Sequence, residues 1–245
     1  MSQWSTAGRA ILAGLQSAWF MSPRDIGLFL RSARTDTAIA RGRGANGDPE
    51  AFDAVYARGD GDPWSSGDSR YRYQSHKYNV LTGLLPARRF GAVIDLGAGH
   101  GLFGRRVADR AKSVLGVDIS GEAVRRAEHL HAGQANMRFE QGDIRAMRPG
   151  WAGQFDLVLL ADTIYYLPPP LSDTTLREMA DAVSALLAPG GICLLANHFF
   201  FAADPDSRLS RRVHRAFSAS TGFRVLSEHR RPFYIVSILE KLLPG

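Results

Sequence analysis

The feature that most constrains the fold is a short apolar run that leads directly into three alternating glycines. Residues 93–101 read Val-Ile-Asp-Leu-Gly-Ala-Gly-His-Gly, and residues 102–112 have a helical composition. Glycine tolerates tight turns and lets backbone N–H groups approach a ligand without an intervening Cβ atom. A buried strand, a glycine turn and a helix in this order predict a ligand site at the carboxyl end of a parallel strand.

This run is the first of five short apolar runs that read as strands, and four of the five read as strands buried on both faces. These five runs lie at residues 92–96, 113–118, 137–141, 155–161 and 192–197, and residues 102–112, 122–131 and 171–187 read as helices between them. Ser120 is well placed to cap the second of these helices. Strands that alternate with helices predict right-handed crossovers and a parallel sheet.

The end of the chain has a different pattern. A helix at residues 208–220 precedes two runs at 223–228 and 234–239, which are joined through Arg230-Arg231-Pro232. A terminal hairpin with an antiparallel strand is the natural interpretation. We therefore expect an α/β, Rossmann-like fold, in which a seven-stranded, mostly parallel sheet with an antiparallel C-terminal strand carries helices on both faces.

The N-terminal part of the chain does not share this regular pattern. Residues 10–20 and 26–32 predict two short helices around Ser22-Pro23, whereas residues 41–48 and 58–68 are rich in turn-forming residues. We expect residues 1–70 to form a partly flexible helical extension that folds as a lid over a domain at residues 71–245. A disordered leader without function is the alternative.

The balance of charge is basic, with 30 Lys and Arg against 24 Asp and Glu, a net charge of +6 and a pI near 9.8. Such a charge invites a nucleic-acid partner. However, only three of the 30 cationic residues are lysines, and a codon bias toward arginine explains the excess without any partner.

The single cysteine and the lengths of the apolar runs indicate the compartment. Cys193 excludes a disulfide within the chain, and its apolar neighbours predict an inert buried thiol. No apolar run reaches the roughly 18 residues that a membrane span needs. The apolar stretch at residues 10–20 is interrupted by Gln16 and soon followed by Arg24. We expect a soluble, cytoplasmic protein without a membrane partner.

Two classes of cofactor compete for the glycine turn. The segment from Gly99 to Gly104 satisfies the G-x-G-x-x-G dinucleotide pattern, and Asp118 follows Gly99 at about the distance of a ribose-binding acid. However, Gly97 already begins the turn, and Asp95 precedes it within the strand. A carboxylate there would repel a pyrophosphate but suits a ligand whose amino-acid end carries an ammonium group.

At these residues the chain resembles the class I S-adenosylmethionine-dependent methyltransferases, over roughly residues 71–240. Their acidic residue two positions before G-x-G-x-G is matched by Asp95, Gly97, Gly99 and Gly101. The resemblance implies that Asp118 binds both ribose hydroxyls and that Asp143 meets the adenine amino group. It implies S-adenosyl-L-methionine as the cofactor. The expected cofactor-binding set is completed by Ala98, Ile119, Ile144 and Ala161.

A narrower resemblance is to the nodulation protein S-type methyltransferases. It rests on Asp62-Pro63-Trp64, on the helix that begins Tyr73-Gln-Ser-His-Lys-Tyr, and on residues 163–167. Gln74 departs from the group's pattern, which has Glu there, so a charged contact does not carry over. The resemblance implies a small-molecule acceptor such as a saccharide or an amine. It also implies that Trp64 and Tyr73 cover the methionine end of the cofactor; simple packing is the alternative.

Methyl transfer from a sulfonium is an in-line displacement, so the enzyme chiefly aligns the reactants and excludes water. A base is needed only where the acceptor must lose a proton. The candidates follow the fourth and fifth strands: Asp162, Tyr165, Tyr166 and His198. His198 is suited to act as a base near neutral pH, and the aromatic residues 199–201 would wall an acceptor pocket. The alternatives are a surface histidine and tyrosines that only pack against the cofactor.

The residues after the fourth strand argue against a nucleic-acid acceptor. They read Ala-Asp-Thr-Ile-Tyr-Tyr rather than the Asn-Pro-Pro-Tyr type of many base-methylating enzymes. No spacing of His, Asp or Glu suggests a metal site. One helix face carries Arg208, Arg211, Arg212 and Arg215, which would meet phosphates or only solvent. We expect methylation of an N or O atom of a small molecule; an RNA methyltransferase and an NAD(P)-dependent oxidoreductase remain the alternatives.

Overall fold

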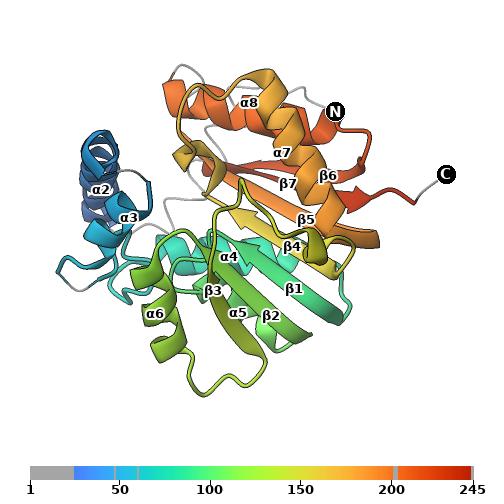
Figure 1. The fold of residues 1–245 in the computed structure, drawn as a ribbon, viewed down its shortest axis with the longest axis horizontal. Coiled ribbons are helices and arrows are strands. Elements are labelled where there is room, and N and C mark those ends of the chain that lie inside the picture. Colours follow the sequence, from blue (N-terminus) through green and yellow to red (C-terminus); the bar gives the residue numbers. More distant parts are fainter. Residues whose placement is uncertain (1–24, 47, 60, 201–203, 244–245) are drawn as a thin grey trace, which may run out of the picture.

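The computed structural model describes residues 25–243 apart from 47, 60 and 201–203, so the helix expected at residues 10–20 lies outside the described residues. Its core is a seven-stranded sheet in the order β3-β2-β1-β4-β5-β7-β6 (Figure 1). The strands are β1 (Phe90–Leu96), β2 (Ala111–Asp118), β3 (Met137–Gln141), β4 (Phe155–Ala161), β5 (Leu187–Phe199), β6 (Phe223–Arg231) and β7 (Phe233–Lys241). β1 to β5 pair in parallel, and β7 lies antiparallel between β5 and β6. The predicted fold class is confirmed.

Helices cover both faces of the sheet because neighbouring strand residues point to opposite sides. Val93 packs in one core with residues of α4 and α5, whereas Ile94 packs in the other core with residues of α7 and α8. The bounds of these helices and of α6 are α4 (Tyr73–Leu84), α5 (Leu102–Ala108), α6 (Gly121–Leu130), α7 (Asp173–Leu186) and α8 (Pro205–Ala219). The sheet is thereby buried on both faces, as its near-continuous apolar strands predict.

Two more helices, α2 (Asp25–Asn46) and α3 (Asp48–Tyr56), lie together at one side of the molecule, away from α7 (Figure 1). The prediction of a turn at residues 41–48 is therefore wrong. Gly42 serves a close helix contact, because a Cβ atom there would lie 3.1 Å from the Cβ atom of Ala51 in α3. Arg43 also pairs with Asp48 across the junction. Tertiary packing thus overrides the weak helix propensity of this segment.

Smaller differences concern the ends of elements. The helix predicted at residues 102–112 ends at Ala108, since Ala111 already pairs with Phe90 as part of β2. β5 extends beyond the predicted 192–197 at both ends, because it pairs with β4 on one side and β7 on the other. The cap of α6 is confirmed: the Ser120 side chain accepts a hydrogen bond from the Ala123 N–H.

The structure also shows the surroundings of Cys193 and the apolar character of the helices. Cys193 is fully buried within β5, and burial raises the pKa of its thiol. Cys193 therefore lies in the core as a small apolar residue.

Among the helices of the described residues, none combines the length and the apolar character that a membrane span requires.

Candidate functional site

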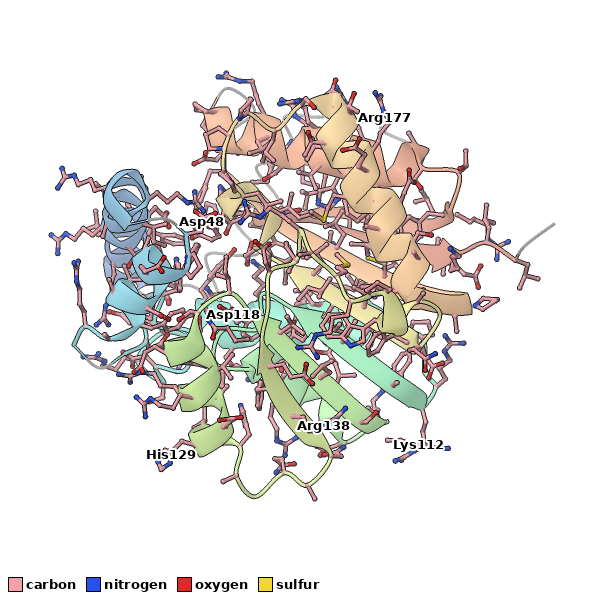
Figure 2. The ribbon with its side chains drawn as sticks, viewed as in Figure 1. Asp48, Lys112, Asp118, His129, Arg138 and Arg177 are labelled. Atoms are coloured by element: carbon pink, nitrogen blue, oxygen red, sulfur yellow. The ribbon has the colours of Figure 1, made fainter. Side chains whose placement is uncertain are left out.

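A cavity of about 380 Å³ opens at the carboxyl ends of the parallel strands. It lies near the neighbouring strands β1 and β4, because the strand order runs outward in one direction from β1 and in the other from β4. Open α/β sheets bind ligands at this switch point, and the volume lies within the range of small-molecule sites. Figure 2 shows Asp118 near the middle of the molecule, on the side of α2 and α3 where Asp48 lies, whereas His129 and Arg177 lie at the periphery.

The glycine loop forms one wall of the cavity and needs glycine for two reasons. Gly97 and Gly99 have φ angles of 72° and 52°, which side chains rarely adopt. A Cβ atom on Gly99 would also lie 2.7 Å from the hydroxyl of Tyr56 in α3. Ala98 lines the cavity between them, whereas Gly101 lies behind the loop, where a Cβ atom would collide with Phe139. The loop thus brings bare backbone to the cavity.

Asp118 is held against the loop from the end of β2. One carboxylate oxygen accepts the Gly99 N–H at 2.8 Å, and the other accepts the Ser120 N–H at 3.0 Å. Burial raises the pKa of Asp118. Each oxygen keeps a further acceptor position, so the carboxylate can take two hydroxyl donors. Asp118 and its neighbour Ile119 both line the cavity, and this geometry fits a ribose.

The other acid of the glycine motif, Asp95, lies behind the loop. Its side chain accepts the Gly104 N–H at 2.9 Å, in the first turn of α5. Only 3% of the residue is exposed, and burial raises the pKa of Asp95 to about 7. Neither Asp95 nor Gly101 belongs to the described lining of the cavity. Asp95 therefore positions the helix that follows the loop, and its direct contact with a ligand stays a prediction.

The segment after β3 forms the next wall, with Asp143 and Ile144 in the lining. The Asp143 carboxylate accepts the backbone N–H of Arg145 at 2.8 Å and three bonds from its guanidinium, at 2.5 to 3.0 Å. Burial opposes ionisation of Asp143, but these bonds outweigh it and lower its pKa. Arg145 also pairs with Asp48 at 3.3 Å, which connects this wall to α3. Ala161 lines the cavity at the end of β4.

Trp64 lines the cavity and is held in place by a chain of hydrogen bonds. Its indole N–H donates to the Tyr166 hydroxyl at 2.8 Å, and that hydroxyl donates to Asp36 of α2 at 2.7 Å. The Trp64 ring also packs against Phe52 and Tyr56 of α3. α2, α3 and the loop after β4 thereby share one wall of the cavity.

All four candidate catalytic residues line this same cavity. The ring centroids of Tyr165 and His198 are 4.2 Å apart, and His198 Nε2 lies 3.9 Å from a carboxylate oxygen of Asp206. Burial, followed by the charge of Asp162, raises the pKa of Tyr165 well above its ordinary value, so its phenol is neutral. The structure therefore brings together a histidine and tyrosines that the sequence places on separate loops.

Asp162 has a buried partner that the sequence did not reveal. The Lys77 ammonium of α4 donates to its carboxylate, and the lysine side chain is only 3% exposed. The Lys77 nitrogen also lies 5.3 Å from the centroid of the Tyr234 ring. Asp162 itself adopts a φ of 55°, which turns it out of β4. The side chain of Tyr73, also in α4, is buried beside Lys77 on the cavity wall.

Several cavity residues escaped the sequence analysis. They come from α2 and α3 and include Phe29, Asp36, Arg43, Phe52 and Tyr56. Nothing in their spacing marks them, because the segment between them has the composition of a turn. Lys77 is different, since it belongs to the motif quoted for the narrower resemblance.

The arginine face of α8 is partly engaged within the protein. Arg212 donates to the Asp173 carboxylate and to the Leu171 carbonyl, and Arg211 lies over the ring of Phe199. These contacts compete with phosphate binding at both arginines.

Comparison with known proteins shows which domain and which fold this chain resembles. Residues 93–191 match the family model described as a methyltransferase domain. The ubiquinone biosynthesis O-methyltransferase of Psychrobacter cryohalolentis is 34% identical over 108 residues, which are 42% of this chain and 39% of that protein. The Acinetobacter baylyi protein of the same name is 33% identical over 112 residues, 44% of this chain and 42% of that protein. The chain thus spans about two-fifths of the length of these curated relatives.

Among solved structures, the N-methyltransferase NodS from Bradyrhizobium japonicum, in complex with S-adenosyl-L-homocysteine, has a TM-score of 0.66. It is 18% identical, and the match covers 79% of this chain and 97% of that one. At this identity the likeness shows a common fold. Together, the two comparisons show that residues 93–191 match a methyltransferase domain and that the chain shares its fold with this S-adenosylhomocysteine-bound enzyme.

Proposed function

We propose that this chain transfers the methyl group of S-adenosylmethionine to a nitrogen or oxygen atom of a small molecule. The observation that carries the proposal is that one cavity contains the glycine loop, Asp118 and the four candidate catalytic residues. The names of the relatives include both an O-methyltransferase and an N-methyltransferase, so both atoms remain open.

In this proposal one part of the cavity binds the cofactor and the other part binds the methyl acceptor. The bare backbone of Gly97 and Gly99, with Asp118 and Asp143, holds the adenosine part of the cofactor, which supplies a methyl group on a cationic sulfur. Trp64 and Tyr73 cover its methionine end. Tyr165 and His198 face the acceptor, and the imidazole removes a proton where the acceptor carries one. Alignment and exclusion of water supply most of the acceleration.

We also propose that residues 1–70 act as a lid on a catalytic domain at residues 71–245. α2 and α3 contribute Asp36, Phe52 and Tyr56 to the cavity wall. Asp53 of α3 accepts hydrogen bonds from the Ser120 hydroxyl and the Glu122 N–H at the start of α6. These contacts support a lid that is fixed beside the ribose end of the site.

Two parts of the proposal rest on the sequence. A cytoplasmic location stays a prediction, because residues 10–20 lie outside the described residues. A small molecule is preferred over RNA because the residues after β4 do not match the base-methylating type. The contacts of Arg211 and Arg212 within the protein support the same preference.

A turnover assay with panels of amino sugars, amines and phenols tests the proposal, with release of S-adenosylhomocysteine as the readout. We expect release above the acceptor-free background for at least one class. His198→Ala should slow that reaction for an acceptor that must lose a proton to the neutral imidazole, whereas His129→Ala, an exposed histidine of α6, should not. A protein that binds S-adenosylhomocysteine yet methylates none of these classes would contradict the small-molecule proposal.

A further inference from the structure

The wall of the cavity is acidic although the chain as a whole is basic. Seven aspartates line it, against Arg43, Lys77 and Arg145, while the net charge of the chain is +6. Each of these three cations already pairs with a cavity aspartate. The remaining negative charge favours positively charged ligands. The cofactor, with its cationic sulfur, accounts for part of this preference.

At one end of the cavity, a second group of acidic side chains lies around His198. The charge of Asp36 in α2 interacts with His198 and with Asp206 of α8. Asp206 in turn lies beside the His198 imidazole. Both aspartates lie on the cavity wall together with Asp162, whose carboxylate has one oxygen buried without a hydrogen-bond partner among the described residues. A ligand at this end therefore meets acceptor oxygens and needs donors of its own.

Aromatic rings surround the same end. The Phe29 ring centroid is 5.4 Å from each of the rings of Tyr73, Phe200 and Phe233, and all four residues line the cavity. Ring faces attract both apolar groups and cations. A ligand with an apolar body and a positive charge fits such a wall better than a sugar hydroxyl array.

Asp36 is the carboxylate best placed to recognise that charge. Within the described chain, its hydrogen bonds come from neutral donors, Tyr166 at 2.7 Å and Trp64 at 3.5 Å, and both reach Oδ1. Among the described residues Oδ2 is thus open to a ligand, and Asp36 lines the cavity while part of its surface stays accessible. Burial in the surrounding protein raises the pKa of Asp36, and a bound cation would stabilise its ionised form.

We infer that the acceptor is an amine that binds as an ammonium ion, with Asp36 as the carboxylate that recognises it and with its apolar part among the rings of Phe29 and Phe200. The inference rests on the proposed function and narrows the acceptor atom to nitrogen. The inference also means that residues of α2, a helix outside the parallel sheet, determine which acceptor binds.

The reaction balances with the groups of the site. The ammonium first gives one proton to the His198 imidazole, which later passes it to solvent. The lone pair of the neutral nitrogen then forms the bond to the methyl carbon, while the carbon–sulfur bond breaks and its electron pair stays on sulfur. The products are the methylated ammonium ion, S-adenosylhomocysteine and the released proton.

Calorimetry on the full chain, saturated with S-adenosylhomocysteine at pH 7, tests the inference with two probes of similar shape. Benzylamine carries an ammonium group and benzyl alcohol a neutral hydroxyl on the same ring. We expect benzylamine to bind at least tenfold more tightly. Asp36→Asn should reduce this preference below threefold when it is measured again at saturating S-adenosylhomocysteine. Asp109→Asn, which alters an exposed carboxylate paired with Arg105, should retain it.

The outcomes separate the inference from the proposed function. If S-adenosylhomocysteine binds but benzylamine binds no better than the alcohol, or not at all, the amine inference is overturned and the methyltransferase proposal stands. That comparison uses the unaltered protein, so it holds even if Asp36→Asn does not fold. A full preference retained in a folded Asp36→Asn variant overturns the role of Asp36. If S-adenosylhomocysteine itself does not bind, the proposed function fails and the inference with it.

Discussion

Replacing Asp95 by Asn should make the stability of the fold less dependent on pH. Asp95 is buried behind the glycine loop, where its side chain accepts the Gly104 N–H at 2.9 Å. An asparagine oxygen can accept the same bond, so the substitution removes the charge and leaves the contact. Because burial disfavours the charged form, the folded chain holds the Asp95 proton to higher pH than the unfolded chain.

The size of the effect follows from the pKa. Burial raises the pKa of Asp95 from an ordinary 3.8 to about 7, which corresponds to about 4 kcal/mol at 1.36 kcal/mol per pH unit. A raised pKa stabilises the fold fully below the unfolded value, and this stabilisation is lost as the pH rises through about 7. Between pH 5 and pH 8 the natural protein should therefore lose about 2.5 kcal/mol relative to Asp95→Asn.

Urea unfolding of both proteins at pH 5, 6, 7 and 8 measures this difference. Other titrating groups are common to the two proteins and cancel in the comparison. Asp109→Asn serves as the control for loss of one carboxylate, because its side chain is 76% exposed. If the free energy of unfolding of Asp95→Asn follows that of the natural protein to within about 0.5 kcal/mol over the whole range, the reasoning about the buried carboxylate is wrong.

Three further variants test the site. Asp118→Ala should weaken S-adenosylhomocysteine binding by about ten- to a hundredfold in calorimetry, since charge-assisted bonds to the loop and the ligand are lost together; an unchanged affinity would remove Asp118 from the site. Gly99→Ala should also weaken that binding, because its Cβ atom would meet Tyr56. The control Gly59→Ala, at a similar φ of 56° and with nothing within 4 Å of its Cβ atom, should keep full affinity. Equal affinities of the two variants would show that the space between Gly99 and Tyr56 does not matter for binding. Lys77→Met should lower the free energy of unfolding by about 3 kcal/mol, because it leaves the Asp162 carboxylate unpaired. Adding Asp162→Asn to this variant should restore most of the lost stability. A Lys77→Met protein as stable as the natural protein would contradict the role of the buried ion pair.

The sheet was predictable because its signals are local. The apolar runs of β1 to β4 are bounded by glycine, proline and capping residues, and the five parallel strands need no information from distant parts of the chain. Ser120 illustrates this, since both its position before α6 and its bond to Ala123 follow from neighbouring residues. The glycine loop was equally evident, because positive φ angles at Gly97 and Gly99 require glycine.

What escaped prediction depends on contacts between distant segments. Gly42 resembles a turn residue, yet it allows α2 to approach Ala51 of α3. The position of Asp36 in the cavity depends on a bond to Tyr166, which is 130 residues away along the chain. For Asp95, the motif indicates an acid near the loop, but the alternation of side chains along β1 determines that it faces α5 rather than the cavity.

The most direct test of the central claim is the choice of cofactor by the purified chain. Calorimetry should give a micromolar dissociation constant for S-adenosylhomocysteine and no measurable heat of binding for NAD or NADH under the same conditions. The reverse result, with the dinucleotide bound and S-adenosylhomocysteine not bound, would contradict the assignment of the glycine loop and Asp118 to S-adenosylmethionine.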